Sequence, residues 1–284
     1  MQYLWLTLVV VLCTLQSVTK KQYNVKHNGT NAFLFTAITS FFAVVVFLIT
    51  GWGNLHFDLA VLPYSIGFAL SHGSASLGLF LAIKYGSLSI TMLVSSYSLI
   101  IPTVYGIIAL GEKLKVVGYA GIVLLFISLF LIRVKDDGKK KNGNFKWVIF
   151  LILAFIGNGM CSTVQKMQQI AFDEAYKNEF MIMALLISTS ILTIASLYDR
   201  KSFKSEFVGC IPMGAATGIA NGITNFLVMV LTGLIPTAIL FPVISAGGIV
   251  LGFVLAVAIY KERLSNTQLV GYALGVVSVV LLNI

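Results

Sequence analysis

LGEKLKVVGYAG (residues 110–121) and YKERLSNTQLVGYAL (residues 260–274) are two versions of one pattern. Each holds an acid, basic residues and a leucine, and each continues to Gly-Tyr-Ala. Apolar sequence lies on both sides of each copy, and the second copy begins 150 residues after the first. The chain is therefore predicted to consist of two related halves.

The composition is that of a chain that lies mostly inside a lipid bilayer. Hydrophobic residues make up 58% of the 284 residues and charged residues only 10%, whereas a soluble protein carries about 25% charge. A membrane-spanning helix needs about 20 mostly apolar residues. An all-α polytopic membrane protein is predicted, with ten helices at approximately 2–19, 31–50, 60–83, 87–110, 115–132, 146–166, 179–198, 207–231, 236–259 and 267–284.

A basic linker, RVKDDGKKKNGNF at 133–145, divides these helices into a first half at 1–132 and a second half at 146–284. Each half has five predicted crossings. Because five is an odd number, the second half must run through the membrane in the opposite sense. Two related halves of opposite sense form an inverted repeat, which places a binding site between them near the membrane midplane.

The halves also match outside the opening pattern. Residues 65–86 align with the second half at a shift of 147 positions, where Gly67 falls on Gly214. SVTKKQ at 17–22 aligns with TVQKMQ at 163–168 at a shift of 146 positions. Two windows in nearly the same register support a repeat that covers more than the motif.

The paired motifs resemble the EamA-type domain of the drug/metabolite transporter superfamily. GEKL at 111–114 and KERL at 261–264 are each followed by a Gly-rich apolar stretch, GYAGIVLLFISLFLI and GYALGVVSVVLLNI. The resemblance covers nearly the whole chain, although Lys261 replaces the usual glycine. It implies a fold of ten helices in two inverted five-helix repeats and a transporter of a small solute, whose nature differs greatly among members.

Small residues at four-residue intervals predict two tightly packed helices. Inside a bilayer, helices associate by close backbone approach at small residues. The glycines at 214, 218 and 222 form two overlapping G-x-x-x-G steps. The packing positions are Gly67, Ser71 and Ala75 in the first half and Gly214, Gly218 and Gly222 in the second.

Polar residues inside the apolar windows are the candidates for a solute site, because such residues are costly in a bilayer and tend to be functional. Asn221 and Asn225 share one helix face beside the packing positions, as expected of a cavity wall. His72 is a candidate for proton coupling, with a helix–helix hydrogen bond as the alternative. The candidate substrate-binding residues are Ser74, Tyr97, Asn158, Gln165, Lys166, Asn221 and Asn225.

The sequence leaves two possible roles open for each of two prolines and one lysine. Pro102 and Pro242 lie inside predicted helices, where a proline removes a hydrogen bond, and they are either gating kinks or simple bends. Lys20 aligns with Lys166. It is a candidate partner for an anion, but a side chain that reaches the lipid headgroups is the favoured interpretation.

All ten acidic residues fall in loops or at helix ends, so no carboxylate is expected at the membrane midplane. A proton-coupled exporter of organic cations usually needs such a group. Its absence favours a neutral, zwitterionic or anionic solute. Glu112 and Glu262 of the repeated motif are predicted to cap the helices that follow by accepting backbone N–H groups.

The net charge of +9 lies in loops that flank the predicted helices, which argues against a nucleic-acid partner.

The same charges predict the orientation in the membrane. Loops after odd-numbered helices hold 15 Lys and Arg, and loops after even-numbered helices hold 4. Cytoplasmic loops carry the excess. Both termini of this multi-pass protein of the plasma (inner) membrane are therefore predicted to lie outside the cytoplasm, unlike those of most members of the family.

The sequence thus predicts a secondary transporter that moves a small organic metabolite through the bilayer by alternating access. A multidrug exporter coupled to protons through His72 and a non-transporting receptor or scaffold are the alternatives. An enzyme, a cofactor and a metal site are not expected, since neither paired acids in the bilayer nor nucleotide or metal motifs occur. Cys13, Cys161 and Cys210 are expected to be free. The two halves suit a monomer, and a homodimer stays open because small relatives pair.

Overall fold

The computed structural model describes residues 2–27, 31–86, 88–98, 100–111, 115–133, 145–198, 200–259 and 265–282. In the first half these residues form α1 (Gln2–His27), α2 (Ala32–Thr50), η1 (a 3₁₀ turn, Leu59–Val61), α3 (Leu62–Tyr85), α4 (Leu88–Tyr97), α5 (Ile100–Ala109) and α6 (Val116–Arg133). In the second half they form α7 (Phe145–Ala171), α8 (Lys177–Ser196), α9 (Arg200–Leu234), α10 (Thr237–Ala258) and α11 (Asn266–Leu282). The predicted caps Glu112 and Glu262 and most of the predicted linker lie outside the described residues.

The described chain is all-helical, and six of its helices are long and apolar enough to cross a membrane: α1, α2, α3, α7, α8 and α9. Large apolar side chains cover much of the outer surface. Ile108, Val116 and Val208 are 79%, 86% and 76% exposed. A surface of this kind belongs against lipid, where helices satisfy their own backbone polar groups. These features are those of a membrane-embedded protein.

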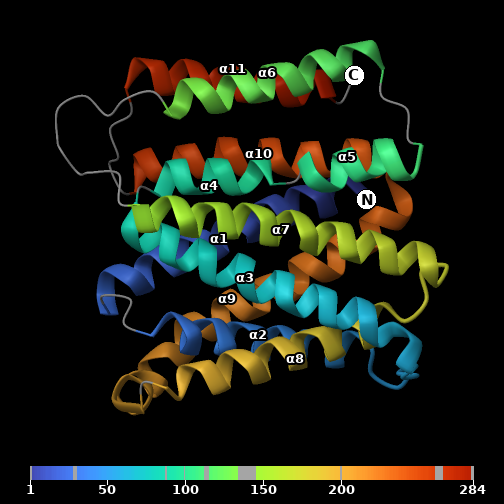
Figure 1. Cartoon of the computed structure of the whole chain (residues 1–284), viewed down its shortest axis with the longest axis vertical. Helices are drawn as coiled ribbons and strands as arrows, with labels where there is room; N and C mark the ends of the chain where they lie inside the picture. The colour runs from blue at the N-terminus through green and yellow to red at the C-terminus, as the bar shows by residue number, and fades with distance from the viewer. Residues whose placement is uncertain are drawn as a thin grey trace.

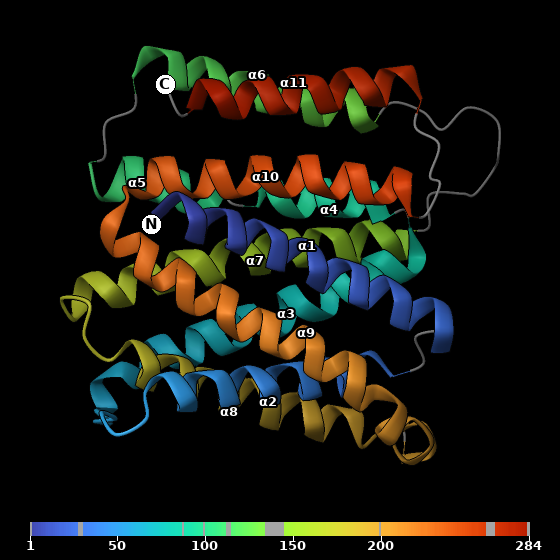
Figure 2. The ribbon, with the colours of Figure 1, turned by 180° about the vertical axis from the view of Figure 1, so that it is seen from behind.

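The helices lie in stacked layers (Figures 1 and 2). α6 packs on α11 at one edge, α10 packs on α4 and α5 in the next layer, and α2 packs on α8 at the opposite edge. Between these layers α3 packs on α7 and α8, and α9 packs on α1 and α2. Helices from the two halves of the chain therefore contact each other in every layer.

Close backbone approach occurs where the sequence places glycine. A Cβ at Gly78 of α3 would lie 2.6 Å from the backbone nitrogen of Ala154 in α7, and a Cβ at Gly157 of α7 would lie 2.5 Å from that of Ala75 in α3. Any side chain at Gly78 or Gly157 would push the two helices apart. The α3–α7 contact thus depends on these two positions.

The glycine stripe of α9 lies against α2. A Cβ at Gly214 would meet Ile38, and one at Gly222 would meet Val46. Gly218 lies between them, over the carbonyl of Thr39. Gly67 of α3 is less confined, because its nearest neighbour is Val164 of α7, at 3.8 Å.

The predicted helix at 87–110 is two helices in the structure. Pro102 lacks an N–H group, and its ring would clash with the carbonyl four residues earlier. That carbonyl belongs to Ser98, and it accepts a hydrogen bond from the backbone nitrogen of Ile101 at 3.0 Å instead. α4 therefore ends before Ser98, whereas α10 runs through Pro242 as one helix.

Several helices extend beyond the predicted apolar windows. α1 continues to His27 rather than ending near 19, α7 continues to Ala171, and α9 begins at Arg200. The added turns carry polar side chains that find partners on neighbouring helices. Asn24 Nδ2 donates to the carbonyl of Phe80 at 3.3 Å, for example. Hydropathy alone makes such helices too short at one end, because it scores the polar residues of their terminal turns as if they faced lipid.

Candidate functional site

The middle layers of the bundle hold a chain of hydrogen-bonded side chains, here called the central polar network: Gln16, His72, Gln165, Asn221 and Asn225. Asn221 Nδ2 donates to Gln16 Oε1 at 3.0 Å. Asn225 Nδ2 donates to Asn221 Oδ1 at 3.1 Å, and Gln165 Nε2 donates to Asn225 Oδ1 at 3.1 Å. His72 Nε2 lies 3.3 Å from Asn221 Oδ1. Four residues predicted from the sequence are thus brought together: His72, Gln165, Asn221 and Asn225.

Three further contacts extend the network to its surroundings. Gln16 Nε2 donates to Thr224 Oγ1 at 3.2 Å, and His72 Nδ1 lies 3.4 Å from Ser188 Oγ. Gln165 Nε2 also approaches the sulfur of Met181 at 3.8 Å. The network therefore joins α1, α3, α7, α8 and α9, and it uses most of the hydrogen-bonding capacity of its amides.

The position of Asn221 and Asn225 follows from the spacing on α9. Residues four apart share a helix face, so the two amides stack one turn apart. Gly218 and Gly222 turn toward α2. This leaves the amide face free to meet α1, α3 and α7.

A cavity of about 120 Å³ lies beside the network. Gln16 belongs to both. The cavity wall comes from α1, α3, α4, α7 and α10 and consists of Cys13, Thr14, Gln16, Ser17, Leu79, Met92, Ser95, Asn158, Ile244 and Gly248. This wall combines polar and apolar side chains and draws on both halves of the chain, as a site for a small organic molecule does.

Asn158 of α7 lies on the cavity wall, as predicted. Its Nδ2 donates to Ser98 Oγ at 2.6 Å, and Ser98 Oγ donates to the carbonyl of Ser95 at 2.5 Å. Ser98 is the residue at the break between α4 and α5. Asn158 thus connects the cavity wall to that break, next to Pro102.

Two predicted site residues lie elsewhere. Tyr97 OH is 2.6 Å from Ser128 Oγ, which donates to the carbonyl of Gly271, so Tyr97 joins α4 to α6 and α11. Ser74 Oγ donates to the carbonyl of Ser71 in its own helix at 2.8 Å, where α3 faces Gly157 of α7. Both side chains are used in helix packing.

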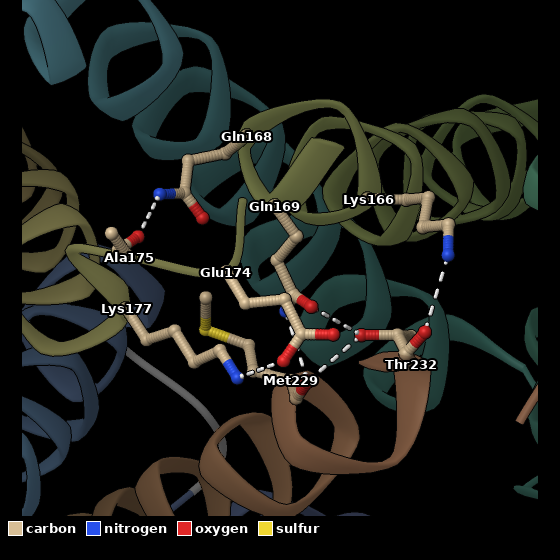
Figure 3. A network of polar contacts seen from close by, with 8 residues as sticks. All are labelled: Lys166, Gln168, Gln169, Glu174, Ala175, Lys177, Met229 and Thr232. Carbon is tan, nitrogen blue, oxygen red and sulfur yellow. Dashed lines mark hydrogen bonds and ion pairs between the residues drawn. The ribbon is translucent and has the colours of Figure 1, made fainter. Parts of the chain in front are cut away.

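Lys166 lies toward the end of α7, in a separate group of polar contacts (Figure 3). Its Nζ donates to the carbonyl of Thr232 at 3.2 Å. Thr232 Oγ1 donates to Gln169 Oε1 at 3.1 Å, and Gln169 Nε2 donates to the carbonyl of Met229 at 3.0 Å. These contacts attach the end of α7 to the end of α9.

Lys20 lies inside the protein, whereas the favoured interpretation of the sequence placed its side chain at the lipid headgroups. Its residue is only 5% exposed, so protein covers the side chain and it does not reach the headgroups. It lies within electrostatic range of Cys13 and His72. It takes part in none of the hydrogen bonds or ion pairs of the described residues.

Two carboxylates bind backbone groups at opposite ends of the bundle. Glu206 Oε2, near the start of α9, accepts from the backbone nitrogen of Asn31 at 3.2 Å and from Tyr23 OH at 3.1 Å. Glu179 Oε1, near the start of α8, accepts from the backbone nitrogen of His56 at 2.7 Å. Each carboxylate thus holds one helix start against the segment that leads into a neighbouring helix.

Sequence reasoning did not select Gln16, Ser188 or Thr224 as site residues, and for Lys20 it favoured the lipid headgroups over a site. Gln16 lies in the middle of α1, whereas the predicted first window, which ends near 19, puts it close to a helix end. Lys20 carried one usable signal, its alignment with Lys166. Ser188 and Thr224 carried none, since hydroxyl groups are common in membrane helices and usually bond to their own backbone.

Within the described ranges, no three or more His, Cys, Asp or Glu side chains come together in a group that could hold a metal ion.

Comparison with known proteins bears on the fold. No family model matches the sequence, and no curated protein matches it. One solved structure, described as "Crystal structure of protein", is similar over 96% of this chain and 97% of its own, with a TM-score of 0.64 and 16% sequence identity. At this identity the likeness shows a shared fold and nothing about function.

Proposed function

We propose that the protein is a secondary transporter that moves a small organic metabolite across the membrane by alternating access. The observation that carries this proposal is the cavity, whose wall combines α1, α3 and α4 of the first half with α7 and α10 of the second. A site at the interface between two halves can be reached from either side when the halves rock against each other.

The packing of the helices supports an inverted repeat. When α1, α2 and α3 are exchanged with α7, α8 and α9, the pair α3–α7 becomes α9–α1, and the pair α2–α9 becomes α8–α3; all four pairs are packed. The α2–α8 and α6–α11 pairs are unchanged by the exchange. α4 and α5 together correspond to α10 and count as one crossing, which gives five crossings in each half and ten in all.

The chemistry of the site supports an organic solute that is not a cation. The central polar network offers amides and an imidazole, and the cavity wall adds hydroxyl groups. None of the described acids lies on the cavity wall or in the network. This arrangement is in keeping with the resemblance to the EamA-type domain, and we assign the chain to that group as part of the proposal.

Orientation in the plasma (inner) membrane remains part of the proposal. Lys20 is buried in α1 and contributes nothing to surface charge, and removing it leaves 14 basic residues against 4. The remaining charge excess still supports termini that lie outside the cytoplasm. A cysteine introduced within 138–143 should resist an impermeant thiol reagent on intact cells, and labelling would overturn the orientation.

The test of transport is counterflow in liposomes that contain the purified protein. A panel of labelled amino acids, nucleosides, sugars and organic acids should include a solute that shows saturable counterflow. Asn221→Ala and Asn225→Ala should abolish this flux without loss of membrane expression. Ser190→Ala is the matched control, because Ser190 is exposed on α8 and, among the described residues, bonds only to the carbonyl of Leu186.

The outcomes separate the transporter from its alternatives. Normal flux in both asparagine variants would remove the network from the site. Binding without counterflow would favour a receptor.

A multidrug exporter coupled to protons is the second candidate, because His72 is the titratable member of the network. In that case a pH gradient should drive uptake, and His72→Gln should abolish the driven uptake while counterflow continues.

A further inference from the structure

The most unusual group in the interior is the ammonium group of Lys20. A lysine inside a membrane protein is costly unless it has a partner. Lys20 is 5% exposed and takes part in no hydrogen bond or ion pair of the described residues. Its position therefore calls for a negative partner other than the described residues.

Lys20 lies on the face of α1 that also carries Cys13, Gln16 and Ser17 of the cavity wall. Side chains on an α-helix lean toward its N-terminus and cover the preceding turn. The preceding turn of α1 carries Gln16 and Ser17, which both line the cavity, and Cys13 lines it one turn further on.

Other donors near Lys20 are already engaged. Thr14 Oγ1 donates to the carbonyl of Val10, and Ser17 Oγ donates to the carbonyl of Cys13. Gln16 Nε2 donates to Thr224. An ammonium group has three N–H donors and no acceptor, and Lys20 donates in none of the hydrogen bonds of the described residues.

We propose that Lys20 is the anion-binding group of this cavity and that the solute is a small organic monocarboxylate; this deepens the proposed transport function and rests on it. A single ammonium group balances one carboxylate. A phosphate carries up to two charges and is usually held by several donors, often from arginine. Lys166, the counterpart of Lys20 in the second half, donates to the carbonyl of Thr232 instead.

The experiment uses the full chain, purified and reconstituted into lipid. The labelled probes are lactate and benzoate as monocarboxylates, lactamide and benzamide as neutral counterparts of the same shape, alanine as a zwitterion, and glycerol 3-phosphate as a phosphate. Equilibrium binding and counterflow are measured for each. We expect a monocarboxylate to bind and to show counterflow, and its amide to do neither.

Variants then assign the effect to Lys20. Lys20→Met should weaken binding of the monocarboxylate at least about thirtyfold, the order expected when one partner of a buried charge pair is removed. Lys20→Arg keeps the charge and should retain most of the binding. Lys26→Met is the control, because it removes the same charge from an exposed position on the same helix. Lys20→Gln repeats the test with a polar replacement if the methionine variant expresses poorly.

Each outcome decides one of the two proposals. Counterflow of an amide or of glycerol 3-phosphate that Lys20→Met leaves unchanged would overturn the role of Lys20 and keep the transporter. Monocarboxylate binding that is lost in Lys20→Met, without counterflow in the unmodified protein, would support the site and overturn transport. Failure of both monocarboxylates to bind would overturn the assignment of the solute.

Discussion

Lys20 and Lys166 occupy matching positions in the two halves of the sequence, but their surroundings in the folded protein differ. Lys166 lies near the ends of α7 and α9, where its Nζ donates to the carbonyl of Thr232 (Figure 3). Lys20 lies further inside α1, is almost fully buried and takes part in none of the described polar contacts. One lysine helps to hold two helices together, and the other is left with unused donors.

The comparison separates two uses of polar groups inside a membrane protein. Groups that bond to each other or to the backbone, such as the central polar network and Lys166, stabilise helix contacts. A charged group without a protein partner destabilises the empty protein and stabilises the complex with a ligand of opposite charge. Four predictions test this separation, from the largest expected effect to the smallest.

Lys20→Met should stabilise the empty protein. A lysine at the centre of a membrane helix costs about 2.5–3.5 kcal/mol, and methionine fills similar space without a charge. The melting temperature of the purified protein in detergent should rise by about 5 °C or more. A lower melting temperature would mean that Lys20 already has a stabilising partner, and Lys20 would then resemble Lys166.

Asn221→Leu should destabilise the protein, because Asn221 contacts Gln16, His72 and Asn225. An interhelical side-chain hydrogen bond in a membrane protein contributes about 0.6 kcal/mol and at most about 1.7. The free energy of unfolding in mixed micelles should fall by about 2 kcal/mol. Ser190→Ala provides the baseline, and an equal effect of the two variants would show that the network adds no stability.

Glu206→Gln and Glu179→Gln test the contacts at the two ends of the bundle. An amide oxygen still accepts from the backbone nitrogens of Asn31 and His56, but the stronger hydrogen bond to a charged group is lost. Each variant should lose about 1 kcal/mol of unfolding free energy. Hydrogen exchange should increase at the start of α2 in the first variant and before α3 in the second. Faster exchange at both ends in either variant would contradict two independent contacts.

Lys166→Met should have the smallest effect. The variant loses one hydrogen bond to a backbone carbonyl, worth about 0.5 kcal/mol, at a partly exposed position. The melting temperature should fall by about 1 °C. A rise like that expected for Lys20→Met would show that the two lysines do not differ, and the comparison above would fail.

The all-helical architecture could be predicted from the sequence because long apolar windows leave few alternatives. The pair Asn221 and Asn225 could also be found, since two amides one turn apart on an apolar helix are rare and point to one face. The amide side chains were therefore the part of the site that residue type and spacing could identify.

The remainder depends on contacts between helices that are distant in sequence. Tyr97 and Ser74 have the same chemistry as site residues, and only the position of α6 and α7 assigns them to packing. Lys20 was expected at the headgroups because hydropathy ended the first helix near 19. Its burial becomes visible only when the last turns of α1 are seen packed inside the protein.

The cavity wall also includes Cys13, whereas Cys161 is packed in a hydrophobic cluster and Cys210 lies against Tyr23. The protein therefore carries a native chemical reporter in the proposed chamber. A small mercurial reagent added to one side of a sealed vesicle should modify Cys13 only while the chamber is open to that side. The rate of modification would then measure how the population divides between the two openings, and a bound solute should slow it by occupying the same space.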